Sequence, residues 1–268
     1  MPVIRYHAPI QLLVAVRGHP FDRRAFDAMF QDMDGIAATM VDQPAAARLI
    51  NPAGMRGFDA LLLYDMPGLD FSAPESPEYV APEAQVVTGF EALLQQGTGI
   101  VALHHSLAGW PSWPSYAEHL GGRFLYRPDM VRGQARLDSG YMHDVAYEAV
   151  VAADHPVTHG VPMRFPMRDE LYLAEIFEND VTPLLRADAG FTSDRFWSAA
   201  HAVAGRMHCR DGWAHPPGSN LIGWTKRAIN SPLVYLQPGD GPETYDNPHY
   251  RRLVENGIRW VVDEARQN

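Results

Sequence analysis

Residues 99–106 read Gly-Ile-Val-Ala-Leu-His-His-Ser, an apolar run that stops abruptly at two histidines and a serine. A short apolar run of this kind, bounded by a glycine, is typical of a buried strand. Two other apolar segments end in a similar way, because 10–16 precedes His19 and 60–64 precedes Asp65. In open α/β sheets, ligands bind beyond the carboxyl ends of the strands. We therefore expect the chemistry of the chain at these strand ends, and first at the paired histidines.

Helical periodicity alternates with these strands in the first half of the chain. Apolar residues recur at helical spacing over 26–33 and 86–94, and Asn247 is a good cap for a final helix. Strands that alternate with helices predict βαβ units and a mostly parallel sheet, hence an α/β fold. No period is evident over 190–220, and no linker divides residues 1–268, so one domain is expected. Further strands are predicted at 146–153, 163–174, 181–187, 221–224 and 233–236.

Composition excludes several classes of protein. The chain has 268 residues, of which 46% are hydrophobic and 20% charged, as in an ordinary globular protein. A formal net charge of −10 argues against nucleic acid and anionic membrane surfaces as partners. Cys209 is the only cysteine, and neither a signal-peptide layout nor an apolar run of about 20 residues is present. These features predict a cytoplasmic protein without a membrane span, and leave open whether it forms a homo-oligomer.

The turn at residues 104–106 is the first candidate site. Neighbouring side chains of an extended chain point to opposite sides, so we expect one of His104 and His105 to face the crevice. An imidazole there can act as a general base, a general acid or a metal ligand, with Ser106 binding substrate. The alternative is that one histidine is a satisfied core residue. His19 is expected at the same edge, unless it only caps the helix that follows it.

Carboxylates supply the second group of candidates. Asp65 could orient a histidine, ligate a metal or bond to N–H groups of its loop. Asp169 and Glu170 lie inside a strand-like run, where burying an unpaired carboxylate is costly. They are therefore candidates for acid–base work or for hydrogen bonds to a sugar hydroxyl, and the alternative is an ion pair with Arg164 or Arg168.

Two tryptophans in a loop segment are further candidates for substrate binding. Trp110 and Trp113 are interspersed with proline and glycine, which suits platforms for sugar rings, although large aromatics also pack loops onto a core. The chain has no G-x-G-x-x-G, no H-E-x-x-H and no Cys/His zinc pattern. Nucleotide binding therefore has no support and no cofactor is certain, while a zinc-like divalent ion stays open.

Taken in order, these segments resemble the ThuA-like family, named for trehalose utilisation. The resemblance spans most of the chain. It implies a three-layer, flavodoxin-like sandwich of the class I glutamine amidotransferase-like type and a carbohydrate as the small-molecule partner. The segments that carry it are 99–106, Trp113, Tyr116, 121–124, 154–162, 169–172 and 256–260, with His19 after the first strand.

The chain departs from the pattern of that family at two places. Where the family has a Gly-His pair near its end, this chain has Gly239-Asp240-Gly241, and Arg127-Pro128 replaces a common His-Pro. A change of chemistry is expected if those histidines serve catalysis or a metal in relatives. The amidotransferase cousins carry a cysteine after the central strand, whereas this turn holds histidines, so glutamine hydrolysis by a thiolate is not expected.

The leading hypothesis is a sugar-processing enzyme, a hydrolase, lyase or isomerase, that acts on a carbohydrate, keto-sugar or glycoside derivative by acid–base chemistry. One alternative is a metal-dependent hydrolase in which the same histidines, with Asp65 or Asp169, hold a zinc-like ion. Another is a non-catalytic sugar-binding protein. The candidate acid–base groups are His19, His105, Asp169 and Glu170, and the candidate substrate-binding residues are His104, Ser106, Asp65, Trp110, Trp113, Tyr172 and Asp240.

Overall fold

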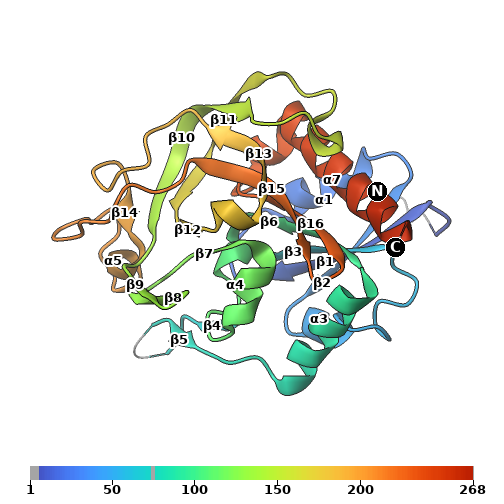
Figure 1. The fold of residues 1–268 in the computed structure, drawn as a ribbon, viewed down its shortest axis with the longest axis horizontal. Helices are drawn as coiled ribbons and strands as arrows, with labels where there is room; N and C mark the ends of the chain where they lie inside the picture. The colour runs from blue at the N-terminus through green and yellow to red at the C-terminus, as the bar shows by residue number, and fades with distance from the viewer. Residues whose placement is uncertain (1–5, 74–75, 268) are drawn as a thin grey trace.

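A computed structural model describes residues 6–73 and 76–267, and its centre is a ten-stranded sheet (Figure 1). One half of the sheet is parallel, as the alternating strands and helices predict. In spatial order its strands are β2 (Ile36–Asp42), β1 (Ile10–Arg17), β3 (Ala60–Asp65), β6 (Gly99–Leu103) and β16 (Ser231–Leu236).

The other half of the sheet is antiparallel, so the sheet is mixed rather than mostly parallel. The reason is that short connections, such as residues 229–230 between the last two long strands, can join only antiparallel neighbours. The antiparallel strands are β15 (Leu221–Ala228), β13 (Thr182–Ala187), β10 (Gly140–Val151) and β11 (Arg164–Leu173), with β14 (Trp197–Ser198) also paired to β10.

Helices cover both faces of the sheet and give the three layers. One core cluster joins α1 (Arg23–Gln31), α6 (Pro242–Asp246) and α7 (Pro248–Arg266) to one face. The other joins α2 (Ala45–Leu49), α3 (Ala84–Gln96), α4 (Pro114–Leu120) and α5 (Ala199–Val203) to the opposite face. Asn247 caps α7 as predicted, since its side chain accepts hydrogen bonds from two backbone N–H groups of the first turn.

Short elements border the sheet, including β14 and α5 in the stretch where the sequence has no period. The two-stranded pairs are β4 (Leu69–Asp70) with β5 (Glu78–Tyr79), β7 (Gly122–Arg123) with β12 (Glu175–Ile176), and β8 (Asp129–Val131) with β9 (Gln134–Arg136). The 3₁₀ turns are η1 (His104–Ala108), η2 (Pro156–Thr158) and η3 (Glu178–Asp180).

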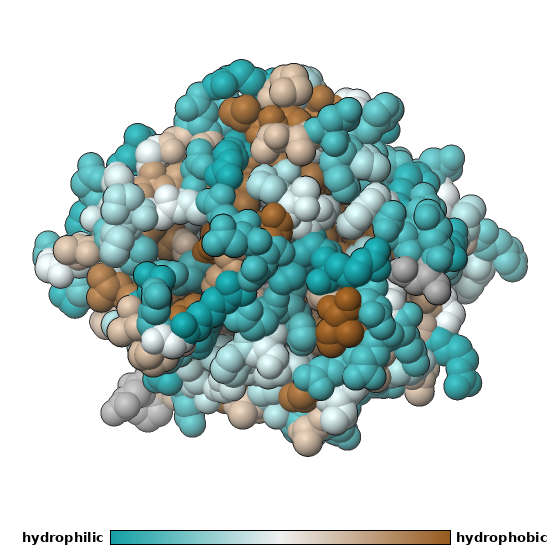
Figure 2. Space-filling model, viewed as in Figure 1, coloured by the Kyte–Doolittle hydropathy of each residue, from teal (hydrophilic) through white to brown (hydrophobic). Residues whose placement is uncertain are grey.

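The surface seen in Figure 2 is mostly hydrophilic, and hydrophobic side chains are scattered over it in small groups. None of the helices among the described residues is both long enough and apolar enough to span a membrane.

Gly99 lets α7 pack directly on the start of β6. A Cβ atom at this position would lie 2.6 Å from the carbonyl oxygen of Val261, which is backbone and cannot rotate away. We predict that Gly99→Ala lowers the free energy of unfolding by about 1–3 kcal/mol, the usual cost of overpacking. Gly241→Ala is the matched control, because Gly241 has an extended φ of −154° and open space around it. Urea unfolding measures both, and equal stability of the two variants would contradict this account.

Candidate active site

Three parallel strands deliver histidine and carboxylate side chains to one edge of the sheet. The chain continues from the carboxyl end of β1 to His19, from β6 to His104 and His105, and from β16 to Asp240. These strands lie close together in the sheet, so their ends meet. The expectation that chemistry gathers at the end of β6 thus leads to a group of titratable side chains.

Strand β11 adds Asp169, Glu170 and Tyr172 to the same place, although three strands separate it from β16 in the sheet. The backbone N–H of Tyr172 donates to the side-chain oxygen of Gln237 at 3.0 Å. The carboxylate of Asp169 accepts from the backbone N–H groups of Gly239 and Asp240, at 2.6 and 3.0 Å. The β10–β11 ribbon therefore folds back over the end of β16 and holds the loop that carries Asp240.

His104 stands at the centre of the group and is fully buried. Its Nδ1–H donates to the backbone carbonyl of Gln237 at 2.7 Å, which turns Nε2 toward acidic partners. Nε2 lies 3.2 Å from Glu170 Oε2 and 3.5 Å from Asp240 Oδ1. It also lies 2.8 Å from the hydroxyl of Tyr172. Burial alone would lower the pKa of His104, but the hydrogen bonds to Asp240 and Glu170 outweigh it and raise that pKa to about 10.

His19 and His105 form a stacked pair beside His104, with ring centroids 4.8 Å apart. Burial, followed by repulsion from His104, lowers the pKa of both imidazoles. His19 donates from Nδ1 to the carbonyl of Pro20 at 2.9 Å, so its neutral form keeps a lone pair on Nε2. His105 donates from Nε2 to the carbonyl of Tyr64 at 3.2 Å. The site thus combines one cationic imidazole with two neutral ones.

A cavity of about 120 Å³ opens next to this group. Glu170 reaches both the cavity and His104, and its second oxygen lies 3.2 Å from Nδ1 of the half-exposed His143. Aromatic side chains form much of the wall. The cavity is lined by His19, Phe124, Tyr126, Tyr141, His143, Glu170, Tyr172, Ala199, Ala202 and Met207.

Several candidates from the sequence lie elsewhere. Asp65 is buried, and its Oδ2 accepts from Gln43 at 2.6 Å. The hydroxyl of Ser106 is also buried and has no hydrogen-bond partner among the described residues. Trp113 packs against Phe90, with ring centroids 5.7 Å apart, and Trp110 lies against the backbone of Gly68. None of these four candidates lines the cavity.

Sequence reasoning missed His143, Tyr126, Tyr141 and Gln237. His143 and Tyr141 lie on β10, which begins at Gly140 rather than at residue 146 as predicted. The ladder between β10 and β11 shifts register between Met142 and Val145, and this bulge breaks the alternation that marks a strand. Gln237 accepts from His104 through its backbone carbonyl, which carries no sequence signal, and from the backbone N–H of Tyr172 through its side chain.

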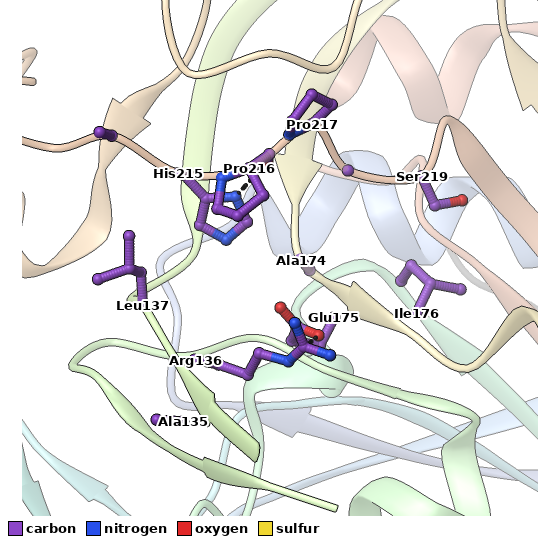
Figure 3. A pocket seen from close by; sticks show the side chains of 12 residues that line it. Ala135, Arg136, Leu137, Ala174, Glu175, Ile176, His215, Pro216, Pro217 and Ser219 are labelled. Atoms are coloured by element: carbon purple, nitrogen blue, oxygen red, sulfur yellow. Dashed lines mark hydrogen bonds and ion pairs between the residues drawn. The ribbon is translucent and has the colours of Figure 1, made fainter.

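A second, larger cavity of about 340 Å³ lies on the border of the sheet (Figure 3). Its wall includes His215, Arg136 and Glu175, with Arg136 Nε 3.2 Å from the Glu175 carboxylate. Nδ1 of His215 donates to the carbonyl of Pro216 at 2.7 Å. The predicted acid–base residues do not line this cavity, so it is a separate feature of the molecule.

Comparison with known proteins supports the family resemblance of the sequence. The family model described as ThuA, trehalose utilisation, matches residues 19–261. A ThuA-like protein from Parabacteroides merdae is 14% identical, with a TM-score of 0.63 over 95% of this chain and 90% of its own. Another from Bacteroides uniformis is 17% identical, with a TM-score of 0.59 over 97% and 95%.

Like these two, other solved structures of low identity show that the fold is shared. A cytoplasmic protein from Salmonella typhimurium is 12% identical, with a TM-score of 0.55 over 94% of this chain and 99% of its own. A GMP synthase subunit from Thermoplasma acidophilum is 11% identical, with a TM-score of 0.52 over 96% of each chain. No curated protein matches the chain. The family resemblance and the class I glutamine amidotransferase-like α/β fold expected from the sequence are confirmed.

The buried carboxyl of Asp65 tests how burial changes the pKa of a side chain and, through it, the pH dependence of stability. Burial raises its pKa from 3.8 to about 6, so the folded protein binds this proton more tightly than the unfolded chain. The cost of the ionised carboxylate is absent below pH 4 and grows as the pH rises to about 6. We predict that Asp65→Asn raises the free energy of unfolding at pH 7 by about 2–3 kcal/mol, and that the gain shrinks toward pH 4. Thermal and urea unfolding across this range measure it, and a pH-independent difference would contradict the assignment.

Proposed function

Because the chain belongs to the ThuA family, we propose that it is an enzyme that acts on a carbohydrate, or on a keto-sugar or glycoside derivative, by proton transfer. The observation that carries the proposal is that His19, Glu170 and His143 line one aromatic-walled cavity at the carboxyl ends of the parallel strands. General acid–base catalysis needs such titratable groups on either side of one bound substrate.

His19 is the proposed base. Its lowered pKa keeps the imidazole neutral at pH 7, and its Nδ1–H is already bound to the carbonyl of Pro20. Nε2 is therefore the nitrogen that can take a proton from a substrate hydroxyl or from a carbon next to a carbonyl. His105 stacks on this ring and is buried, so we assign it a positioning role rather than contact with the substrate.

Glu170 and His143 are the proposed groups on the other side of the substrate. One oxygen of Glu170 faces His104 and the other faces His143, so a proton can pass between the carboxylate and the half-exposed imidazole. Asp169 is assigned a positioning role, because the backbone N–H groups of residues 239 and 240 occupy both of its oxygens.

The size and walls of the cavity support a small cyclic substrate. A volume of about 120 Å³ lies below the roughly 300–1,000 Å³ typical of sites for larger ligands. Tyr126, Tyr141 and Phe124 offer apolar ring faces on which a sugar ring can pack. One sugar unit, rather than an oligosaccharide, therefore suits the cavity.

We further propose that residues 1–268 act as one domain and that the protein is cytoplasmic. A single sheet runs from β2 to β11 across both halves of the chain, which supports the first point. The lone Cys209 and the likeness to a cytoplasmic Salmonella protein support the second.

His19→Gln and Glu170→Gln test the proposed chemistry on a panel of monosaccharides, simple glycosides, trehalose and their keto derivatives. We expect each substitution to lower kcat/KM on the substrate turned over by the wild type by about 10²–10⁴-fold, the usual contribution of a general acid or base. His159→Gln is the control, because His159 is exposed and does not line the cavity.

Unchanged turnover in His19→Gln would overturn the assignment of the base. A wild type that is thermally stabilised by a sugar but turns over no member of the panel would point to a non-catalytic sugar-binding protein.

A further inference from the structure

We propose that His104, Glu170 and Asp240 bind one divalent transition-metal ion, of the zinc or manganese type, next to the cavity that Glu170 lines. The proposal deepens the proposed function and rests on it only for the role of the ion in catalysis. The inference that an ion binds does not depend on the proposed function, because it is argued from the three side chains alone.

The spacing of the ligand atoms fits a metal. His104 Nε2 lies 3.2 Å from an oxygen of Glu170 and 3.5 Å from an oxygen of Asp240, and all three ligand atoms lie within 4.8 Å of one another. Ligands about 2.1 Å from a tetrahedral ion are separated by about 3.4 Å. An ion can therefore enter between these atoms with only small side-chain movements.

The proposed ligands have the kind of hydrogen-bond partners that orient ligands in known metal sites. A metal-bound histidine usually donates its other ring N–H to a carbonyl or carboxylate, which fixes the ring and its tautomer. Here His104 Nδ1–H donates to the carbonyl of Gln237 at 2.7 Å. Asp169 fixes the backbone on which Asp240 sits. These hydrogen bonds fix the ring of His104 and the backbone of Asp240 in the absence of an ion.

Burial and charge also favour a cation. Side chains of His104 and Glu170 are 0% and 4% exposed, and that of Asp240 is 34% exposed. Two carboxylates held this close together in a mostly buried site require a positive partner. Protonated His104 supplies that charge when no ion is bound, and an ion that binds Nε2 takes the place of its proton. Asp240 provides the route from solvent by which an ion can enter.

The donor set indicates the class of ion and its place in the site. Imidazole with carboxylates suits zinc, manganese or iron, whereas magnesium and calcium prefer oxygen ligands alone. Three protein ligands leave a coordination position open, as in catalytic rather than structural sites. Glu170 also lines the cavity, so an ion held by these residues would lie near the proposed sugar site, where it would polarise a substrate oxygen.

Calorimetric titration tests the proposal. The tag-free protein is first treated with a chelator to remove bound ions, and it is then titrated with zinc chloride and, separately, with manganese chloride. We expect one ion per chain in the wild type. Asp240→Asn and Glu170→Gln should each weaken binding at least tenfold. Asp144→Asn is the matched control, because Asp144 is an exposed carboxylate on β10 that pairs with Arg168.

Asp240→Asn is the more informative variant, since its side chain is partly exposed and the substitution keeps its shape. Circular dichroism and thermal unfolding check that the variants are folded. No binding by the wild type, or equal binding by the wild type and Asp240→Asn, would overturn the metal site.

Turnover measured separately distinguishes the two proposals. An ion bound without sugar turnover would leave the metal site and remove the proposed function. Turnover that depends on His19 in a protein that binds no ion would support the proposed function and overturn the metal site.

Discussion

The hydrogen bond from His104 to the carbonyl of Gln237 organises the site. It joins the end of β6 to the end of β16 and fixes the imidazole in one orientation. His104 adopts a φ of 47°, in the left-handed region, which costs a residue with a side chain roughly 1 kcal/mol or more. The packing around the fully buried ring maintains this conformation, and Nε2 consequently faces the carboxylates of Glu170 and Asp240.

From this orientation follows an unequal distribution of charge among three neighbouring imidazoles. Carboxylates hold the pKa of His104 at about 10, and its charge adds to burial in lowering the pKa values of His19 and His105. Environments that push the pKa values of neighbouring groups apart separate acid and base roles. The cationic His104 with its carboxylates, next to the neutral His19 that lines the cavity, is suited to separate acid and base roles.

The part of the site that sequence could predict is the part built by parallel strands. Strand ends of a parallel sheet meet at one edge, so His19 and His104 could be placed together from their positions after apolar runs. The position of Asp65 after an apolar run also placed it at this edge, but did not show to which face of the sheet its side chain points. Tyr64 packs into the core beneath α1, and side chains alternate along a strand, so Asp65 points to the opposite face.

The rest of the site depends on a long-range fold that no local pattern records. Glu170 was a candidate because a buried carboxylate needs a partner, yet its contact with His104 arises only when the β10–β11 ribbon folds back. His143 escaped notice because a bulge interrupts its strand. Trp113, in contrast, looked like a sugar platform and packs against Phe90 instead.

A crystal structure of the protein soaked with trehalose and with a keto-glucoside tests the central claim most directly. The account predicts one sugar ring in the cavity between Tyr126 and His19, with a sugar oxygen within hydrogen-bond distance of His19 Nε2 and of Glu170. Sugar bound only in the larger cavity beside His215 and Arg136 would contradict it.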